Sequence, residues 1–276
     1  MHRIKANGAN IPCIGLGTWT LSGGACRDLV ANALDVGYRH IDTAASYGNE
    51  REVGAGIRAS SVARNEIFVT TKVWYTDLHA GDFRRSAEAS LERLGLDHVD
   101  LLLIHWPSRT IALAETIDAL NAARENGLTR HIGVSNFPTS LLVEAIRLSR
   151  VPLAVNQVEY HPMLDQTKLL GACRAEGMAM VSYCPLQRGR ALLDRQEVVA
   201  AARRYGKTPA QVVLRWHVQQ DGVGAIPRTS RRERLAENLD IFDFALSDDE
   251  MNAISALRRA NDRICDFHFA PEWDPV

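Results

Sequence analysis

Hydrophobic and polar positions alternate regularly along the chain. Short apolar runs are followed by segments whose apolar residues recur three and four positions apart. The runs predict buried strands, and the wider spacing predicts amphipathic helices. The predicted strands span residues 14–17, 39–42, 67–72, 99–105, 130–135, 153–157, 178–183 and 223–226. The longer predicted helices span residues 26–34, 50–59, 83–94, 112–125, 166–175, 195–204, 231–239 and 247–257, with others near 141–146 and after Thr208.

Eight strands that are each followed by helix predict a (β/α)8 TIM barrel, built as a single domain over residues 1–276. Asn7-Gly8, between two short extended runs, predicts an N-terminal β-hairpin. An open doubly wound sheet is the alternative. It is disfavoured because no G-x-G-x-x-G follows an early strand, and Gly15-x-Gly17 is only a fragment of that pattern.

Composition narrows the class of protein. Hydrophobic residues make up 46% and charged residues 24%, with 32 basic and 33 acidic, so we expect a globular chain without a nucleic-acid surface. The longest apolar runs are too short for a membrane span, and the first residues do not resemble a secretory signal. Five scattered cysteines fit a reducing compartment, and no pair has metal-ligand spacing. These features predict a cytoplasmic protein without a metal site.

Polar residues stand at the ends of the predicted strands, where a barrel enzyme keeps its chemistry. Each has a structural explanation when taken alone, such as a capping aspartate or a solvated lysine. Together they predict one site at one rim, because polar groups after successive apolar strands are costly without partners. These residues are Asp42, Tyr47, Lys72, His105, Ser135, Asn136, Asn156, Gln157, Tyr183, Pro227 and Arg228.

The chemistry of these groups suits carbonyl reduction. An ammonium near Tyr47 is expected to lower the phenol pKa from its usual value near 10, and an aspartate would orient that ammonium. A histidine could donate to the carbonyl oxygen or relay a proton, while hydride must come from a cofactor. Two alternatives stay open. One is a Schiff-base aldolase with Lys72 as nucleophile. The other is a cofactor-sensing subunit with very slow turnover.

Six motifs together resemble the aldo-keto reductases, and they span nearly the whole chain. They are GYRHIDTAASYGNEREVG (37–54), FVTTKVW (68–74), LLLIHWP (101–107), GVSNF (133–137), NQVEYHP (156–162) and IPRTSRRERLAENLDIF (226–242). The short loops and the ending NDRICDFHFAPEWDPV look most similar to bacterial 2,5-diketo-D-gluconate reductases of the type that also reduces methylglyoxal and β-keto esters.

The resemblance implies a catalytic tetrad in which Tyr47 is the acid, Lys72 modulates its pKa, Asp42 partners Lys72 and His105 orients the carbonyl. It also implies NADPH as cofactor. Thr18, Trp19 and Asp42 are expected among the cofactor-binding residues. Ser135, Asn136 and Gln157 would hold the nicotinamide carboxamide, and Tyr183 would stack on the nicotinamide ring. The loop over the pyrophosphate would contain Pro185, Leu186 and Gly189. The 2′-phosphate and adenine end would involve Ile226, Arg228, Thr229, Ser230, Arg234, Glu237 and Asn238.

One departure concerns Arg228-Thr229, where family members commonly have Lys-Ser. Arginine keeps the positive charge of lysine, and threonine keeps the hydroxyl of serine. A preference for NADP is therefore expected, together with some tolerance of NAD. Arg231 and Arg232 add charge to the same segment, and the helix N-terminus that follows is expected to attract the anion.

Trp19, Trp74 and Trp106 follow three of the predicted strands and are expected to form an apolar substrate pocket. The brief loop after residue 107 and the modest tail favour small carbonyl substrates. The sequence does not place His268 and Trp273. Cys184 is expected to be an inert wall residue, and a monomer is expected from the resemblance.

Overall fold

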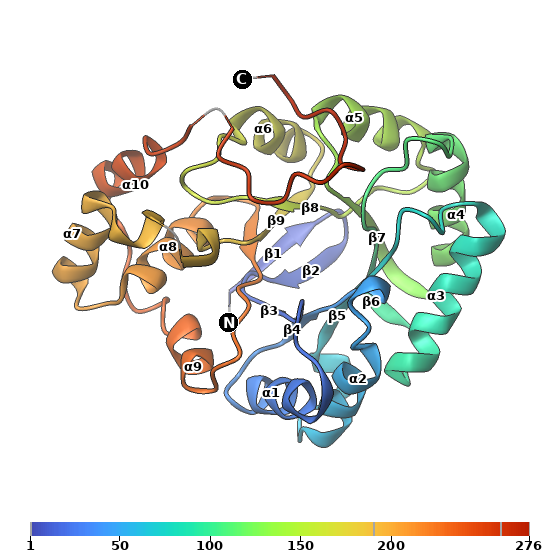
Figure 1. Ribbon diagram of the computed structural model, residues 1–276, viewed down its shortest axis with the longest axis horizontal. Helices are drawn as coiled ribbons and strands as arrows, with labels where there is room; N and C mark the ends of the chain where they lie inside the picture. Colours follow the sequence, from blue (N-terminus) through green and yellow to red (C-terminus); the bar gives the residue numbers. More distant parts are fainter. Residues whose placement is uncertain (1, 190, 260, 276) are drawn as a thin grey trace.

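The computed structural model describes residues 2–189, 191–259 and 261–275. Its main sheet is parallel, and neighbouring strands follow one another in chain order (Figure 1). The strands are β3 (Leu16–Gly17), β4 (His40–Asp42), β5 (Phe68–Val73), β6 (Val99–Ile104), β7 (Thr129–Ser135), β8 (Val155–Glu159), β9 (Ala179–Tyr183) and β10 (Val223–Ala225). The sheet closes where the Gly15 amide donates to Ala225 O at 2.9 Å and the Ala225 amide donates to Cys13 O at 2.8 Å. The predicted (β/α)8 barrel is confirmed.

Helices surround the strands, as Figure 1 shows. They are α1 (Gly23–Asp35), α2 (Glu50–Ala59), α3 (Ala80–Leu94), α4 (Leu113–Glu125), α5 (Thr139–Leu148), α6 (Thr167–Ala175), α7 (Gln196–Tyr205), α8 (Pro209–Val218), α9 (Glu233–Leu239) and α10 (Asp248–Ser255). The predicted start of α8 is confirmed, since the Thr208 hydroxyl accepts from the Gln211 amide. The capping box of Ser247 and Glu250 is also present at α10. Within the described part of the chain, no helix is long and apolar enough to cross a membrane.

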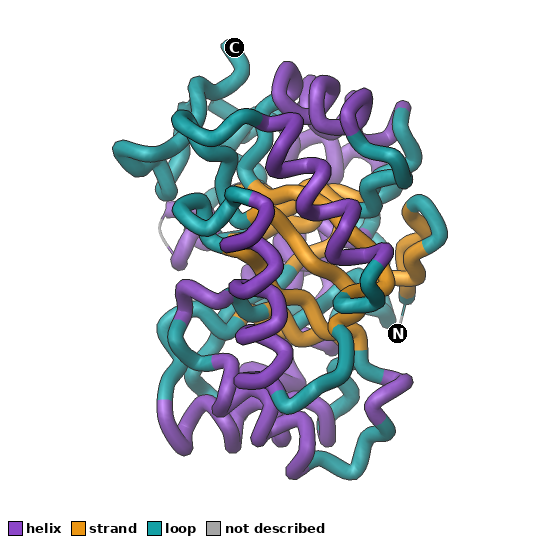
Figure 2. The backbone as a smooth tube through the Cα atoms, turned by 90° about the vertical axis from the view of Figure 1, so that its right-hand side faces the viewer, coloured by secondary structure: helices purple, strands orange, loops and turns teal. Residues whose placement is uncertain are grey.

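The apolar core has two parts. The larger part lies between the sheet and the helices. The smaller part fills the barrel interior with inward-facing side chains such as Leu101, Leu103 and Val181, and it includes Ala9 and Ile11 of the N-terminal hairpin. Figure 2 places this hairpin at one end of the barrel and the C-terminal segment at the other. The interior is therefore packed, and it leaves the opposite end for the polar residues.

The predicted hairpin consists of β1 (Arg3–Ala6) and β2 (Ala9–Pro12). Asn7 and Gly8 both have positive φ, 44° and 85°, as a tight two-residue turn requires. The Asn7 amide also donates to Leu153 O at 2.7 Å and Glu176 O at 2.9 Å. The hairpin is thus held against the barrel by its turn.

Gly54 allows α2 to approach the end of α3 closely. A Cβ at this position would lie 2.0 Å from Leu94 O, so any side chain would push the two helices apart. This close approach fixes α2, and with it the loop that enters α2 from β4. That loop carries Tyr47.

Candidate active site

The loop between β4 and α2 is folded by hydrogen bonds from its own polar residues. The Asn49 amide donates to Thr18 O at 2.8 Å and Leu21 O at 2.9 Å, while the Thr43 hydroxyl donates to Asn49 Oδ1 at 2.8 Å. Asn49 therefore ties this loop to the loop after β3. Tyr47 ends the short 3-10 turn Ala45–Tyr47 within it and is thereby turned toward β5.

Lys72 is fully buried near the end of β5. Its ammonium donates to Asp42 Oδ1 at 2.6 Å, Thr43 O at 2.8 Å and the Tyr47 hydroxyl at 3.3 Å. The second Asp42 oxygen accepts from Gln157 Nε2 at 2.6 Å. Burial lowers the pKa of Lys72, and the Asp42 carboxylate opposes that effect. All three ammonium N–H groups therefore have partners.

The structure reverses one electrostatic expectation. We expected the ammonium to lower the pKa of Tyr47, but burial and then the Asp42 carboxylate raise it well above 10. The phenol contacts the Lys72 ammonium, which is itself bonded to the Asp42 carboxylate, so both charges act on the phenol. Tyr47 therefore keeps its proton at neutral pH, which is the form required of a proton donor.

His105 follows β6 and is buried beside Tyr47, with 5.5 Å between the two ring centroids. Its other ring contact is Trp74 at 5.0 Å, and its Nδ1 lies 3.3 Å from the Ser46 hydroxyl. Burial and then the Lys72 charge hold the pKa of His105 well below 6.5. The imidazole is therefore neutral at neutral pH and can donate from one nitrogen. We call Asp42, Tyr47, Lys72 and His105 the polar corner.

The residues expected near the nicotinamide lie at the ends of the next strands and are bonded to one another. The Ser135 hydroxyl donates to Gln157 O at 2.7 Å, and the Asn136 amide donates to His105 O at 2.9 Å. Tyr183 donates to Asn136 Oδ1 at 2.7 Å. Ser135, Asn136 and Gln157 are buried, whereas Tyr183 is half-buried. Amides and a hydroxyl gathered beside the polar corner have the donors and acceptors that a carboxamide needs.

The loops flanking this group contain the remaining expected contacts. Thr18 is buried, and its hydroxyl donates to Asp42 O at 2.9 Å. After β9, Pro185 O is 3.1 Å from His217 Nε2, while Leu186 is half-buried and Gly189 is exposed.

Residues 228–234, which we call the arginine segment, follow β10. Their side chains are largely exposed, apart from Thr229. Arg228 Nε donates to Trp19 O at 3.3 Å, but among the described residues no ion pair involves Arg231, Arg232 or Arg234. Helix α9 begins at Glu233, later than predicted, and has only seven residues. The arginines, more than a helix end, thus supply the positive charge.

Several side chains at this end already have protein partners. The buried Thr229 hydroxyl accepts from the Arg231 amide at 3.0 Å, so it closes a local turn. Glu237 Oε1 accepts from the Thr208 hydroxyl at 2.8 Å, and Asn238 is buried beside Tyr38. The remaining two expected residues differ in exposure. Ile226 is buried in the barrel interior and Ser230 is exposed.

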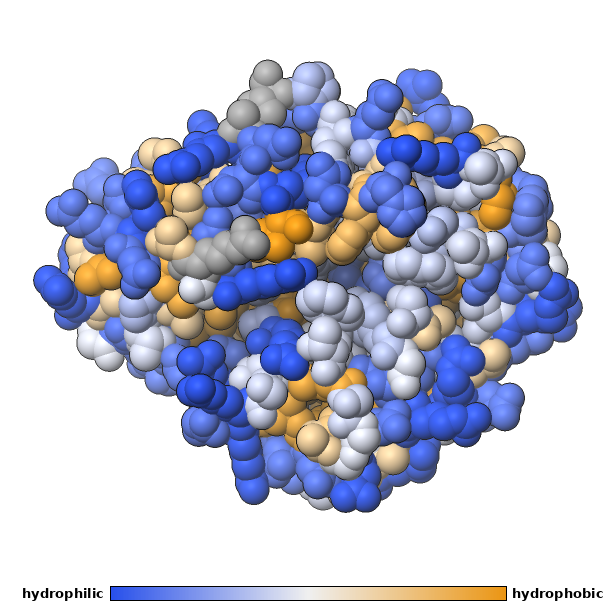
Figure 3. Space-filling view, in the orientation of Figure 1, coloured by the Kyte–Doolittle hydropathy of each residue, from blue (hydrophilic) through white to orange (hydrophobic). Residues whose placement is uncertain are grey.

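Figure 3 shows a hollow near the middle of the face that Figure 1 also presents. The three predicted pocket tryptophans differ in their contacts. Trp74 and Trp106 are linked by Phe269, whose ring centroid lies 5.4 Å from each. Trp273 also packs on Trp106 at 6.1 Å. Trp19 is 45% exposed and has the Arg188 guanidinium 4.8 Å from its ring. Sequence reasoning missed Phe269, although the FHF run in the tail was a visible aromatic signal.

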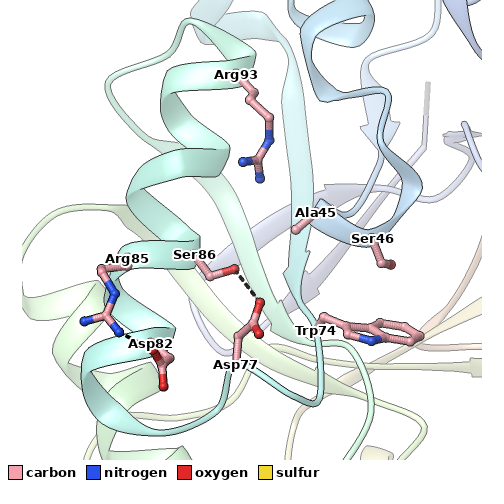
Figure 4. A pocket seen from close by; sticks show the side chains of 8 residues that line it. All are labelled: Ala45, Ser46, Trp74, Asp77, Asp82, Arg85, Ser86 and Arg93. Carbon is pink, nitrogen blue, oxygen red and sulfur yellow. Dashed lines mark hydrogen bonds and ion pairs between the residues drawn. The ribbon is translucent and has the colours of Figure 1, made fainter.

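A cavity of about 470 Å³ lies next to the polar corner, between the Ala45–Ser46 turn and α3. Figure 4 shows Trp74 on one side and Arg93 on the other, with Asp77 bonded to Ser86 at 3.4 Å. Arg93 Nε also donates to the buried Glu50 carboxylate at 2.7 Å. The cavity shares Ser46 and Trp74 with the surroundings of His105, while most of its lining comes from α3 and the residues just before it.

Comparison with known proteins agrees with this geometry. The aldo/keto reductase family model matches residues 13–259. Glyoxal reductase of Bacillus subtilis (strain 168) is 42% identical over 254 residues, covering 92% of this chain and 91% of that protein. A solved structure provisionally called 2,5-diketo-D-gluconic acid reductase B has a TM-score of 0.97 and 48% identity, covering 99% of this chain and 98% of that one. A Bombyx mori aldo-keto reductase in complex with NADP has a TM-score of 0.89 and 35% identity, covering 96% and 94%.

Proposed function

The chain belongs to the aldo/keto reductase family, and on that premise we propose that it reduces small aldehydes and ketones with NADPH. The observation that carries the proposal is the Tyr47 hydroxyl, 3.3 Å from the Lys72 ammonium and packed against His105. The names of two relatives suggest glyoxal and diketo sugar acids as substrates, and the resemblance adds methylglyoxal and β-keto esters. We further propose a monomeric, cytoplasmic enzyme with one domain.

Tyr47 donates the proton in this reaction. When NADPH is bound, it would supply hydride to the carbonyl carbon, so negative charge would develop on the oxygen. Tyr47 carries a proton at neutral pH and releases it toward that oxygen, while the Lys72 ammonium stabilises the resulting phenolate. The neutral His105 donates a second hydrogen bond to the oxygen. If the Ser46 hydroxyl donates to Nδ1, the other ring nitrogen carries the hydrogen for this role.

The cofactor residues divide into two groups with different chemistry. Ser135, Asn136 and Gln157 would hold the carboxamide of NADPH, and Tyr183 would stack on its ring, which would fix the face presented to substrate. The loop with Pro185, Leu186 and Gly189 covers the pyrophosphate. Arg228, Ser230, Arg234 and the Thr229 turn receive the 2′-phosphate, with Glu237 and Asn238 toward the adenine. Thr18, Trp19 and Ile226 complete the walls.

The contacts of Lys72 argue against the aldolase alternative. A Schiff-base lysine must offer a free lone pair, whereas all three N–H groups of this buried ammonium are bound to Asp42, Thr43 and Tyr47. Borohydride trapping with substrate tests the point, and a covalent adduct on Lys72 would overturn the reductase assignment. The relatives are reductases, among them a glyoxal reductase, and this favours an enzyme over a cofactor-sensing subunit. Turnover tests that choice.

The decisive experiment is a substrate panel run with NADPH and with NADH. Methylglyoxal, a β-keto ester and a diketo sugar acid are each added while nucleotide absorbance is followed. We expect carbonyl-dependent NADPH oxidation that exceeds the NADH rate. Tight NADPH binding with no carbonyl-dependent oxidation across the panel would favour the cofactor-sensing subunit.

A further inference from the structure

Two segments border the same end of the barrel and contact each other. The strap, residues 184–189, follows β9, and the tail, residues 261–275, crosses this end of the barrel (Figure 1). Gln187 Nε2 donates to Asp262 Oδ2 at 2.8 Å, and Arg188 Nη2 donates to Cys265 Sγ at 3.4 Å. Cys184, Gln187 and Arg188 all have positive φ, so the strap follows an uncommon path that brings its side chains to the tail.

The strap and the tail each contribute one thiol to a shared cluster. The Arg188 guanidinium donates to Cys265 Sγ at 3.4 Å, and its charge also acts on the Cys184 thiol. Cys184 is half-buried, whereas Cys265 is buried. The tail thiol is held in place because the Glu159 carboxylate accepts the amides of Ile264 and Cys265, both at 2.7 Å. Glu159 also pairs in register with Tyr183, the residue before Cys184, so two separately anchored segments bring the two thiols to the same side of β8.

This environment differs from that of the other cysteines and from our expectation of an inert thiol. The neighbouring Cys265 thiol and the Arg188 guanidinium lower the pKa of Cys184, although burial and Glu159 oppose them. Burial instead raises the pKa of Cys13 and Cys26 to about 11. Thiolate character and access decide which cysteines react with oxidants.

We propose that Cys184 and Cys265 are a modification site, in which a hydroperoxide oxidises Cys184 and Cys265 then closes a disulfide. The Cys184 thiolate attacks the terminal peroxide oxygen, breaking the O–O bond and releasing an alcohol or, from hydrogen peroxide, water. The Cys265 sulfur attacks the resulting sulfenic acid, forming the S–S bond and releasing water with its thiol proton. Two thiols lose two electrons in total, and the peroxide gains them.

The disulfide would join the strap to the tail covalently. Cys184 adjoins Tyr183, whose hydroxyl is bonded to Asn136, so the link would restrain both the strap and this side of the site. Oxidised protein should show slower amide hydrogen exchange in residues 184–189 than reduced protein. If the proposed function also holds, NADPH should dissociate more slowly from the oxidised form. The exchange measurement does not depend on that function.

The test treats the full-length reduced protein with a small excess of hydrogen peroxide, followed by mass spectrometry and non-reducing peptide mapping. We expect a loss of two hydrogen atoms and a peptide that joins residue 184 to residue 265, both reversed by a thiol reductant. Cys184→Ser and Cys265→Ser should each abolish the link, and in Cys265→Ser dimedone should label Cys184. The matched control Cys173→Ser removes a buried thiol whose pKa burial raises to about 12, and it should leave the link unchanged.

Three outcomes would overturn the proposal: a link between other cysteines, dimedone labelling of Cys184 no faster than of Cys173, or a linked strap whose hydrogen exchange is unchanged. Replacement of Arg188 by glutamine removes the charge while keeping a polar side chain, and it should slow formation of the link. An unchanged rate in that variant would contradict the role given to the guanidinium.

Discussion

The polar corner and the arginine segment both contain charged side chains. They are buried and paired in the polar corner but exposed in the arginine segment. In the polar corner, Lys72 and Asp42 are buried and bonded to each other and to neighbouring polar atoms. In the arginine segment, Arg231 and Arg234 are exposed, and no ion pair of the described residues includes them. A buried charge needs a partner inside the protein, whereas an exposed charge is stabilised by water and needs no protein partner. The polar corner is therefore organised by folding, whereas the arginines of the arginine segment remain exposed to solvent.

The largest expected effect comes from removing one oxygen of the polar corner. Tyr47→Phe deletes the proposed proton donor, so kcat should fall by roughly 10²–10⁴-fold while NADPH affinity stays nearly constant. Steady-state rates and fluorescence titration measure the two quantities. The control is Tyr205→Phe, which removes the same atom where it bonds Glu250 on the outside of the barrel. A Tyr47→Phe enzyme with its full rate would move the role of donor to another group, His105 first.

A second substitution tests whether the polar corner is also a stability element. Lys72→Met keeps the length of the side chain but leaves the Asp42 carboxylate buried without its cation, which should lower the free energy of unfolding by about 3–5 kcal/mol. Urea unfolding measures it. The matched substitution Arg234→Met, in the arginine segment, should change that free energy by no more than about 0.5 kcal/mol. Equal effects at both positions would erase the distinction between the two regions.

The arginine segment should affect cofactor choice instead. Arg234→Ala removes a charged hydrogen bond to the proposed 2′-phosphate, worth about 1.5–3 kcal/mol, so the Kd for NADPH should rise by roughly 10–150-fold. The Kd for NADH should hardly change, because NADH lacks that phosphate. Arg203→Ala, at an exposed arginine on α7, controls for the general loss of charge. If NADPH and NADH weaken equally, the phosphate assignment is wrong.

The smallest expected change is in the pH dependence of carbonyl reduction. The pKa of His105 lies well below 6.5 and that of Tyr47 well above 10. Reduction requires a protonated phenol, so kcat should fall only as pH rises through the raised Tyr47 pKa. On the acid side, kcat should fall only well below pH 6.5, where His105 gains a proton. Rates measured between these limits should be flat, and a transition near neutrality would show that binding of cofactor and substrate changes one of the two groups.

Sequence patterns predicted the barrel because burial on both faces leaves a simple apolar run for each central strand. The sequence patterns located the ends of a strand less accurately where the strand contains a buried polar residue. The strand predicted at 153–157 is observed at Val155–Glu159, since Glu159 is buried and pairs in register with Tyr183. Its carboxylate is satisfied by backbone amides of the tail, more than a hundred positions away. A local pattern cannot indicate partners at that separation.

The candidate site shows the same division. The residue types at the strand ends were readable, because successive polar groups after apolar strands are unusual. The direction of the Tyr47 pKa shift could not be read from the sequence. It depends on the burial of Tyr47 and on how far its hydroxyl lies from Asp42 as well as from Lys72. The contact of Phe269 with Trp74 and Trp106, and the meeting of Cys184 with Cys265, also depend on how the tail is laid across the barrel.

The order of residues alone thus determined the alternation of strands and helices, the caps of the later helices and the set of chemical groups available at one rim. These follow from short-range spacing and from the need to bury apolar faces. Only the tertiary structure decided which of those groups touch, which charges are buried together, and which side chains cover the mouth of the barrel. Electrostatic and contact energies depend on distance in space. For residues far apart in sequence, only the folded tertiary structure sets that distance.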